Sequence, residues 1–390
     1  MVGPMANASR NLLSGYHGSP PLLVSPLSAM TTALGEGRVV YAQGCSAHGN
    51  DASGMAEAIG AAESADVVVV GLGLCGLNYA GEDPACPEID EAEANERTSI
   101  ELPGLQLELL QNLVATGKRV VLFLLNAGSV DVTWAKEHVD AIVWAGYPGE
   151  LGGAAVANVL LGKTNPGGAL PLTWYTQALM DKSSITDMAM RPSAHSPGRT
   201  YRFLPSAPAA TTATSDLPLW PFGHSESYTT FKVAVVGGAG DGHGAGGGFG
   251  GGAGAPHDGG VGEMIVFNAT HKEQVVEVLV TNTGKVVGDK IVMLFAKAVE
   301  QTAVKVPPLR TLVGFERAVA IAPAAFRGGG SGGGGSGSGE ARKVSFTVTA
   351  SMFDLVNEDG VKVTAHGSTH KLEIGGDGAG SNLVVNVKVE

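Results

Sequence analysis

The sequence has little basic charge and no long apolar run, and each shortage excludes a class of partner. Its 390 residues carry 25 Lys and Arg against 37 Asp and Glu, a net charge of -12. Nucleic acids and anionic membranes bind clustered basic faces, so we expect neither partner. No apolar run reaches the roughly 20 residues that span a bilayer. The start, MVGPMANASRN, also lacks the apolar core of a secretory signal peptide.

Cysteine is scarce as well, with only Cys45, Cys75 and Cys86. Three cysteines are too few for a disulfide framework, and they lack the C-x-x-C spacing of zinc and redox sites. We therefore expect no metal and no cofactor. Cys75 and Cys86 flank an acidic loop and could form a disulfide there, which would leave Cys45 free. Three unpaired, small apolar side chains are an equally good interpretation.

Three glycines imitate a dinucleotide-binding motif. Residues 67–70 predict a buried strand, and Gly71, Gly73 and Gly76 follow it in the spacing G-x-G-x-x-G. That motif needs a helix whose N-terminus faces the pyrophosphate. Residues 78–88 contain prolines and no apolar repeat of 3.6 residues, so a loop follows and a nucleotide site is not expected.

From Asp66 onward apolar strands alternate with helices. We expect strands at 67–70, 119–125, 141–145 and 170–174, and helices at 105–114, 130–138 and 154–161. Continuous apolar strands separated by helices imply a parallel sheet that is covered on both faces. The first part of the chain therefore predicts an α/β fold.

After Phe231 the pattern changes to an all-β domain. We expect strands at 275–280, 291–296, 309–316, 344–348 and 371–374, with the first two paired. Two glycine tracts, 237–262 and 328–339, cannot bury enough apolar surface to offset backbone entropy, so we interpret them as flexible insertions. The predicted domains are residues 1–231 and 232–390.

Several motifs resemble those of the family 3 glycoside hydrolases. The segment from Glu91 to Gly104, EAEANERTSIELPG, is similar to that family's second-domain signature, which is close to EAEGLDRTSIELPG. The strings NAGSVDV from Asn126, WAGYPGELGG from Trp144 and PGRTYRF from Pro197 resemble the family in the same order. Glycines and prolines shape tight turns, so we assign those in these strings to the fold and give none a catalytic role.

Later strings complete the resemblance. VTNTGKVVGD, LVGFER and LVNEDG are similar to the fibronectin type III-like domain that closes many of these enzymes. The resemblance implies a parallel-core α/β sandwich domain followed by an all-β, fibronectin type III-like sandwich.

The resemblance also implies an activity, the hydrolysis of terminal β-O-glycosidic bonds in oligosaccharides. The mechanism is retaining and uses two carboxyl groups about 5 to 5.5 Å apart. In this family the nucleophilic aspartate belongs to an N-terminal (β/α)8 barrel of about 250 residues, for which the chain has no room. We therefore expect a barrel domain as a partner, an oligosaccharide substrate, an extracellular or cell-wall location, and no activity of the chain alone. The EAE form of the signature favours a β-xylosidase over a β-glucosidase.

Glu91 is the best match to the family's acid/base glutamate, because it precedes Arg97 at the family's spacing. The chain departs from the signature at residues 94–96, and Glu93 is the fallback. The acidic residues of this loop could instead be a solvated surface without a catalytic role. A non-catalytic carbohydrate-binding or scaffold protein, built from the two accessory domains, is the alternative function. An in-frame barrel encoded upstream of Met1 would decide for the enzyme.

Overall fold

The computed structural model describes residues 1–77, 81–93, 95, 97–184, 186–206, 216–238, 264–268, 272–299, 304–323, 340–375 and 383–390. The predicted glycine insertions, 237–262 and 328–339, lie outside these residues apart from 237 and 238. Contacts divide the chain into two units, residues 1–164 with 174–181 and residues 165–173 with 182–390. Among the described residues, the helices are too short or too polar to cross a membrane.

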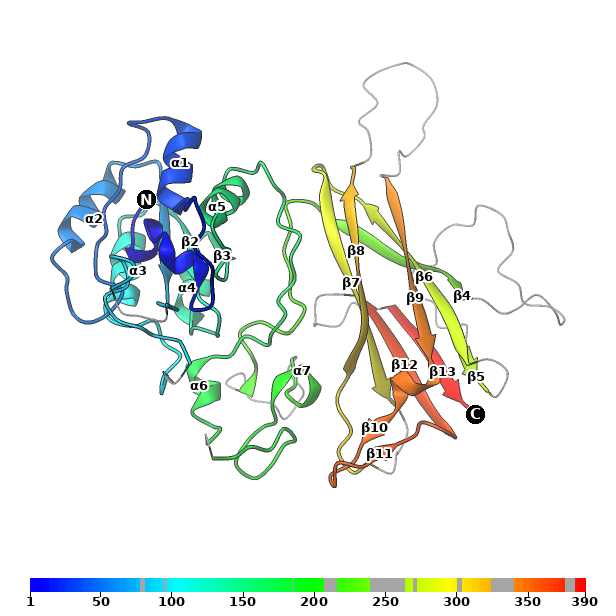
Figure 1. The fold of residues 1–390 in the computed structure, drawn as a ribbon. Helices are drawn as coiled ribbons and strands as arrows, with labels where there is room; N and C mark the ends of the chain where they lie inside the picture. Colours follow the sequence, from blue (N-terminus) through cyan, green and yellow to red (C-terminus); the bar gives the residue numbers. More distant parts are fainter. Residues whose placement is uncertain are drawn as a thin grey trace, which may run out of the picture. The chain divides into compact units, whose positions relative to one another are not determined.

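The first unit is built on a parallel sheet of three strands (Figure 1). Strands β1 (Val67–Gly73), β2 (Arg119–Leu125) and β3 (Ala141–Trp144) lie in that order, and both pairs are parallel. The helices are α1 (Pro26–Leu34), α2 (Met55–Glu63), α3 (Gln106–Ala115), α4 (Thr133–His138), α5 (Gly152–Leu160) and α6 (Gln177–Met180), preceded by the 3-10 turns Pro4–Ala6 and Arg10–Leu13. The predicted α/β class with a parallel core is confirmed.

Apolar periodicity explains the packing of this unit. Leu109, Leu110 and Leu113 recur at helical spacing and are fully buried, and α3 packs against β1 and β2. A second cluster joins Phe123 and Leu125 of β2 to the N-terminal 3-10 turns. Helix α3 and the N-terminal turns therefore both cover strands of this sheet. Strands that are covered in this way are continuous apolar runs in the sequence, as β1 and β2 are.

The strand expected at 170–174 is wrong. This segment forms no strand of the parallel sheet, and Pro171 inside it has no N–H to donate to a ladder. Trp174 is buried in the first unit instead, where its indole N–H donates to the carbonyl of Val130 at 2.8 Å. The segment 170–174, whose apolar pattern predicts a strand, therefore contributes the side chain of Trp174 to the core instead.

The second unit is a β-sandwich. One sheet has the order β4 (Phe231–Gly238), β6 (Glu273–Asn282), β9 (Ala341–Thr349). The other has the order β5 (Met264–Phe267), β13 (Leu383–Val389), β12 (Ser368–Gly375), β7 (Gly288–Ala298), β8 (Thr311–Ile321). A short pair, β10 (Leu355–Val356) and β11 (Lys362–Val363), and the helix α7 (Thr200–Phe203) complete it. Apolar residues of both sheets form one core, which confirms the predicted all-β sandwich.

The expected pairing of strands 275–280 and 291–296 is wrong, because β6 and β7 belong to different sheets. The connection between them leads from one sheet to the other and is not a hairpin. Buried Asn282 holds this corner, where its amide N–H groups donate to the carbonyls of Val286 and Ile321, each at 2.7 Å. These side-chain bonds fix the end of β6, where the chain leaves its sheet.

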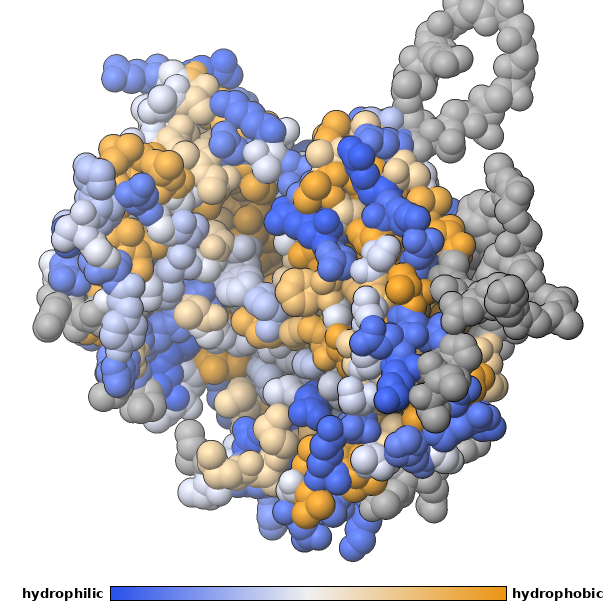
Figure 2. Space-filling model, turned by 45° about the vertical axis from the view of Figure 1, so that its right-hand side comes forward, coloured by the Kyte–Doolittle hydropathy of each residue, from blue (hydrophilic) through white to orange (hydrophobic). Residues whose placement is uncertain are grey.

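Residues ahead of β4 also pack within the second unit. The guanidinium of Arg191 donates to the carbonyls of Val306 and Val356, and the ring of Tyr201 stacks on that of Phe222 with centroids 4.3 Å apart. The domain boundary at residue 231 stays a prediction. On the face of the molecule shown in Figure 2, hydrophobic and hydrophilic residues are interspersed.

Candidate active site

The candidate site lies at the carboxyl ends of the three parallel strands. Glu91 belongs to the long loop after β1, Ala127 and Gly128 follow β2, and Tyr147 follows β3. Carboxyl ends of parallel strands meet at one edge of a sheet, which is where open α/β sheets bind ligands. The structure brings all four residues together there.

Three donors hold the carboxylate of Glu91. The backbone N–H of Ala127 donates to Oε1 at 2.6 Å and that of Gly128 to Oε2 at 3.1 Å. The hydroxyl of Tyr147 donates to Oε1 at 2.5 Å and lies 3.2 Å from the carbonyl oxygen of Leu74. Glu91 is half-buried, so these bonds fix its side chain against the sheet edge while part of it remains accessible.

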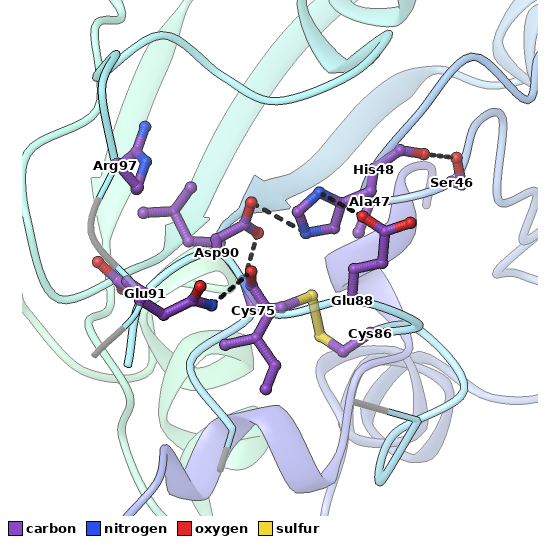
Figure 3. A network of polar contacts seen from close by, with 12 residues as sticks. Ser46, Ala47, His48, Cys75, Cys86, Glu88, Asp90, Glu91 and Arg97 are labelled. Atoms are coloured by element: carbon purple, nitrogen blue, oxygen red, sulfur yellow. Dashed lines mark hydrogen bonds and ion pairs between the residues drawn. A yellow bond between two sulfur atoms is a disulfide. The ribbon is translucent and has the colours of Figure 1, made fainter. Parts of the chain in front are cut away.

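The backbone at Glu91 is fixed by Cys75. The N–H groups of Asp90 and Glu91 donate to the carbonyl oxygen of Cys75 at 2.9 and 3.2 Å, and the N–H of Cys75 donates to Oδ2 of Asp90 at 2.7 Å. Figure 3 shows Asp90 between Cys75 and His48, whose Nε2 lies 2.9 Å from Oδ1 of Asp90. The acidic loop is therefore an ordered segment where it carries Glu91.

The sequence allows either a disulfide between Cys75 and Cys86 or three unpaired cysteines, and the structure contains the disulfide. Cys75 and Cys86 are bonded, and Cys45 is a buried free thiol whose pKa is raised to about 12, mainly by burial. The sulfur of Cys75 and the ligand atoms of His48 and Asp90 lie within 4.8 Å of one another, close enough to surround a metal ion. Because this sulfur is bonded to Cys86, it offers no thiolate to a metal.

Burial and charge shift the pKa values of the groups around Glu91. Burial raises the pKa of Tyr147, and the negative charge of Glu91 adds to that effect, so Tyr147 remains a donor at ordinary pH. Burial lowers the pKa of Arg97, while Glu91 and Asp90 favour its charged form. The carboxylate of Asp90, whose Oδ1 lies 2.9 Å from Nε2, raises the pKa of His48.

The structure places Glu93 differently. Its side chain is exposed, and Oε2 accepts a hydrogen bond from Tyr16, which is 79% exposed. The departures from the signature at Ala94 and Glu96 lie outside the described residues. Of the two glutamates predicted for the acid/base role, Glu91 is the one at the sheet edge.

Packing explains the three glycines that imitate a nucleotide motif. A Cβ at Gly71 would lie 2.5 Å from the ring of Phe123, and one at Gly73 would lie 2.0 Å from the carbonyl oxygen of Leu125. A Cβ at Gly76 would lie 2.5 Å from the hydroxyl of Tyr147. Each glycine admits a close neighbour, and the last one leaves room for the tyrosine that holds Glu91.

Sequence reasoning missed three residues of this site, Ala127, Gly128 and Tyr147. The glycines and prolines of their strings, NAGSVDV and WAGYPGELGG, predict turns of the fold and no catalytic role. The signal that could have found them is their position, because each string directly follows a predicted parallel strand.

Comparison with known proteins identifies a family. The model of the glycosyl hydrolase family 3 C-terminal domain matches residues 1–228. "Probable exo-1,4-beta-xylosidase xlnD" of Neosartorya fischeri is 35% identical over 330 residues, which are 84% of this chain and 38% of that protein. "Probable exo-1,4-beta-xylosidase bxlB" of Aspergillus flavus is 34% identical over 326 residues, 83% of this chain and 37% of that protein. The chain thus spans well under half the length of these relatives.

Solved structures agree with the fold. A GH3 exo-beta-xylosidase (XlnD) in complex with a xylobiose aziridine activity-based probe aligns with a TM-score of 0.76 and 25% identity, covering 100% of this chain and 44% of that one. A beta-glucosidase from Listeria innocua in complex with isofagomine aligns with a TM-score of 0.69 and 21% identity, covering 100% of this chain and 45% of that one. The second likeness concerns the fold alone.

Proposed function

Since this chain belongs to glycosyl hydrolase family 3, with that family's C-terminal domain in residues 1–228, we propose that it supplies the acid/base half of a retaining β-glycosidase. The reaction is the hydrolysis of terminal β-O-glycosidic bonds in oligosaccharides, with β-xylosides favoured over β-glucosides. The observation that carries the proposal is the carboxylate of Glu91, held at the sheet edge by Ala127, Gly128 and Tyr147.

The relatives support the choice of bond and sugar. The curated relatives named above are described as exo-1,4-beta-xylosidases, and one aligned structure holds a xylobiose-derived probe. The chain covers 38% of the first of them. We therefore propose that the nucleophilic carboxylate comes from a barrel domain outside this chain, as the family resemblance implies.

Glu91 would act twice in this mechanism. In the first step protonated Glu91 gives its proton to the glycosidic oxygen, while the barrel's carboxylate attacks the anomeric carbon and the leaving group departs. In the second step ionised Glu91 takes a proton from water, whose oxygen attacks the same carbon and releases the enzyme carboxylate. The donors from Ala127 and Gly128 fit the ionised form that exists between the two steps.

A non-catalytic scaffold remains the alternative, and one observation favours it. The hydrogen bonds of Glu91 join the loop after β1 to the segments after β2 and β3, so the side chain also braces the sheet edge. In such a protein Glu91 would contribute to stability alone.

We also propose an extracellular or cell-wall location. The disulfide between Cys75 and Cys86 is typical of proteins that fold in an oxidising compartment. Separation of a host's culture medium from its cells, followed by detection of the protein, would test the location.

The role of Glu91 can be tested by its dependence on the leaving group. We would join this chain to the barrel of a family 3 xylosidase and replace Glu91→Ala. General acid catalysis contributes about 10² to 10⁴ in rate, and dinitrophenyl groups depart without a proton. Hydrolysis of xylobiose should therefore slow by that factor, while formation of the glycosyl-enzyme from dinitrophenyl xyloside should slow far less. Azide needs no general base, so it should restore turnover as the β-xylosyl azide.

Glu93→Ala is the matched control and should show neither effect. If Glu91→Ala matches the parent on both substrates while Glu93→Ala shows the difference, the acid is Glu93. If neither variant responds, the acid lies outside this loop and the scaffold alternative gains support.

A further inference from the structure

Asp90 is a buried carboxyl group next to Glu91 in the chain. Its side chain is 5% exposed, and it accepts the N–H of Cys75 through Oδ2. A buried carboxylate needs partners for both oxygens, or its desolvation destabilises the fold. Oδ1 has its partner in His48, at 2.9 Å from Nε2.

His48 reaches Asp90 from a different part of the chain. It lies between α2 and the short segment around Ala42, and its side chain is 16% exposed. Figure 3 shows the imidazole between Asp90 and Glu88. Nδ1 of His48 lies 3.8 Å from Glu88, whose side chain is 73% exposed, so Asp90 is the stronger partner.

The position of Asp90 determines the position of Glu91. Both residues donate their backbone N–H to the carbonyl oxygen of Cys75, so a shift of Asp90 would carry Glu91 with it. The carboxylate of Glu91 would then lose its fit to the N–H groups of Ala127 and Gly128. Misplacing a reacting group by about 1 Å can reduce a rate about a hundredfold.

We propose that His48 and Asp90 form a positioning pair that holds Glu91 in place through the backbone of Cys75. The inference rests on the proposed acid/base role of Glu91. Neither His48 nor Asp90 touches the substrate in this assignment. They act on the reaction by fixing the loop that carries the acid.

The charges around His48 give the pair a pH dependence. Asp90 and Glu88 favour the imidazolium, while burial and the positive charge of Arg97 oppose it, and the net effect raises the pKa of His48 above 6.5. The contribution of the pair to loop order is therefore complete below pH 6.5 and is lost as the pH rises through the raised pKa. Above that pKa a neutral imidazole leaves the carboxylate of Asp90 without its charged partner.

Hydrogen exchange in the 390-residue chain tests the pair without any assay of activity. The measured quantities are the protection factors of the Ala127 and Gly128 amides, which donate to Glu91. In His48→Ala both should fall on the order of tenfold, as for the loss of a hydrogen bond to a charged group. In the parent chain they should fall as the pH rises from about 5.5 to about 8.5. His48→Gln retains an N–H donor without a titrating group, so its protection should be partly restored and independent of His48 titration.

His195→Ala, at an exposed histidine of the second unit, is the control and should change neither amide. Protection of Leu110 and Phe123 reports that the first unit stays folded. Unchanged protection of Ala127 and Gly128 in folded His48→Ala would overturn the proposal, as would protection in the parent that ignores pH. If His48→Ala lowers the protection of the two amides but Glu91→Ala shows no leaving-group effect, the positioning pair stands and the acid/base role of Glu91 is refuted. If Glu91→Ala shows the leaving-group effect but His48→Ala changes neither amide, the acid/base role stands and the positioning pair is refuted.

Discussion

At the scale of single residues, Tyr147 connects two groups at the sheet edge. Its hydroxyl donates to Glu91 and lies near the carbonyl oxygen of Leu74. Burial raises the pKa of Tyr147, so the hydroxyl stays protonated and can donate. A hydrogen bond to a charged group contributes roughly 1.5 to 3 kcal/mol, which corresponds to about ten- to hundredfold in an equilibrium.

Tyr147→Phe should therefore weaken the hold on Glu91 without changing the shape of the side chain. In the protein that joins this chain to a xylosidase barrel, we expect kcat/KM for xylobiose to fall about tenfold. The temperature of unfolding of the first unit should fall by a few degrees, because the oxygen of Glu91 loses a buried donor. Steady-state kinetics and thermal unfolding measure the two effects.

Tyr16→Phe is the matched control for this prediction. It removes the hydrogen bond to Glu93 from an exposed tyrosine, so both measurements should match the parent. An effect at Tyr16 with none at Tyr147 would contradict the assignment of Glu91 and favour Glu93.

The sequence could predict Glu91 but not what holds it. Glu91 stands out because it precedes Arg97 at a family spacing, which is a local pattern. The contact with Tyr147 joins residues 56 positions apart and depends on two strands ending at the same edge. Such contacts follow from strand order, which no local pattern contains. The sequence leaves the pairing of Cys75 with Cys86 open for the same reason, since spacing alone does not fix the distance between two thiols.

At the scale of elements, the long loop between β1 and α3 combines a covalent and a noncovalent anchor. The disulfide closes a loop with a sequence separation of 11. Four residues after Cys86, Asp90 returns to the backbone of Cys75. Cys75 therefore fixes both ends of the segment that leads to Glu91.

Cys75→Ser combined with Cys86→Ser should destabilise the first unit. Closing a loop of this length stabilises a fold by about 3 kcal/mol, by restricting the unfolded chain. We expect the free energy of unfolding to fall by about 2 to 4 kcal/mol in urea titrations that follow the first unit. Dithiothreitol should destabilise the parent chain similarly and leave the double variant unchanged. Equal unfolding midpoints of the parent with and without reductant would contradict the prediction.

Elements with a clear period were predictable, and their partners were not. The helix expected at 105–114 is α3, Gln106–Ala115, and the strand expected at 119–125 is β2. By contrast, 275–280 and 291–296 are strands as expected but lie in different sheets. The alternation of apolar and polar residues shows which face of a strand is buried. Strands of two sheets that share one core have the same alternation, so the pattern does not show which strands pair.

At the scale of the whole molecule, we propose that the chain supplies one of the two carboxyl groups that the reaction needs. Asp90 is engaged by His48 and Cys75, and Glu93 by Tyr16, and we assign the nucleophilic role to neither of them. A retaining mechanism needs its nucleophile about 5 to 5.5 Å from the acid, on the opposite face of the sugar.

The chain by itself should therefore hydrolyse aryl β-xylosides and β-glucosides no faster than buffer. A single carboxyl group can protonate a leaving oxygen, but without a nucleophile no glycosyl-enzyme forms. Release of nitrophenol from both glycosides by the purified 390-residue chain measures this, with the barrel-joined protein as the positive control. Turnover by the chain alone that disappears in Glu91→Ala would place a nucleophile within these 390 residues. Turnover that persists in Glu91→Ala would instead indicate a contaminating glycosidase, and the same preparation from a host that lacks the chain should then show it too.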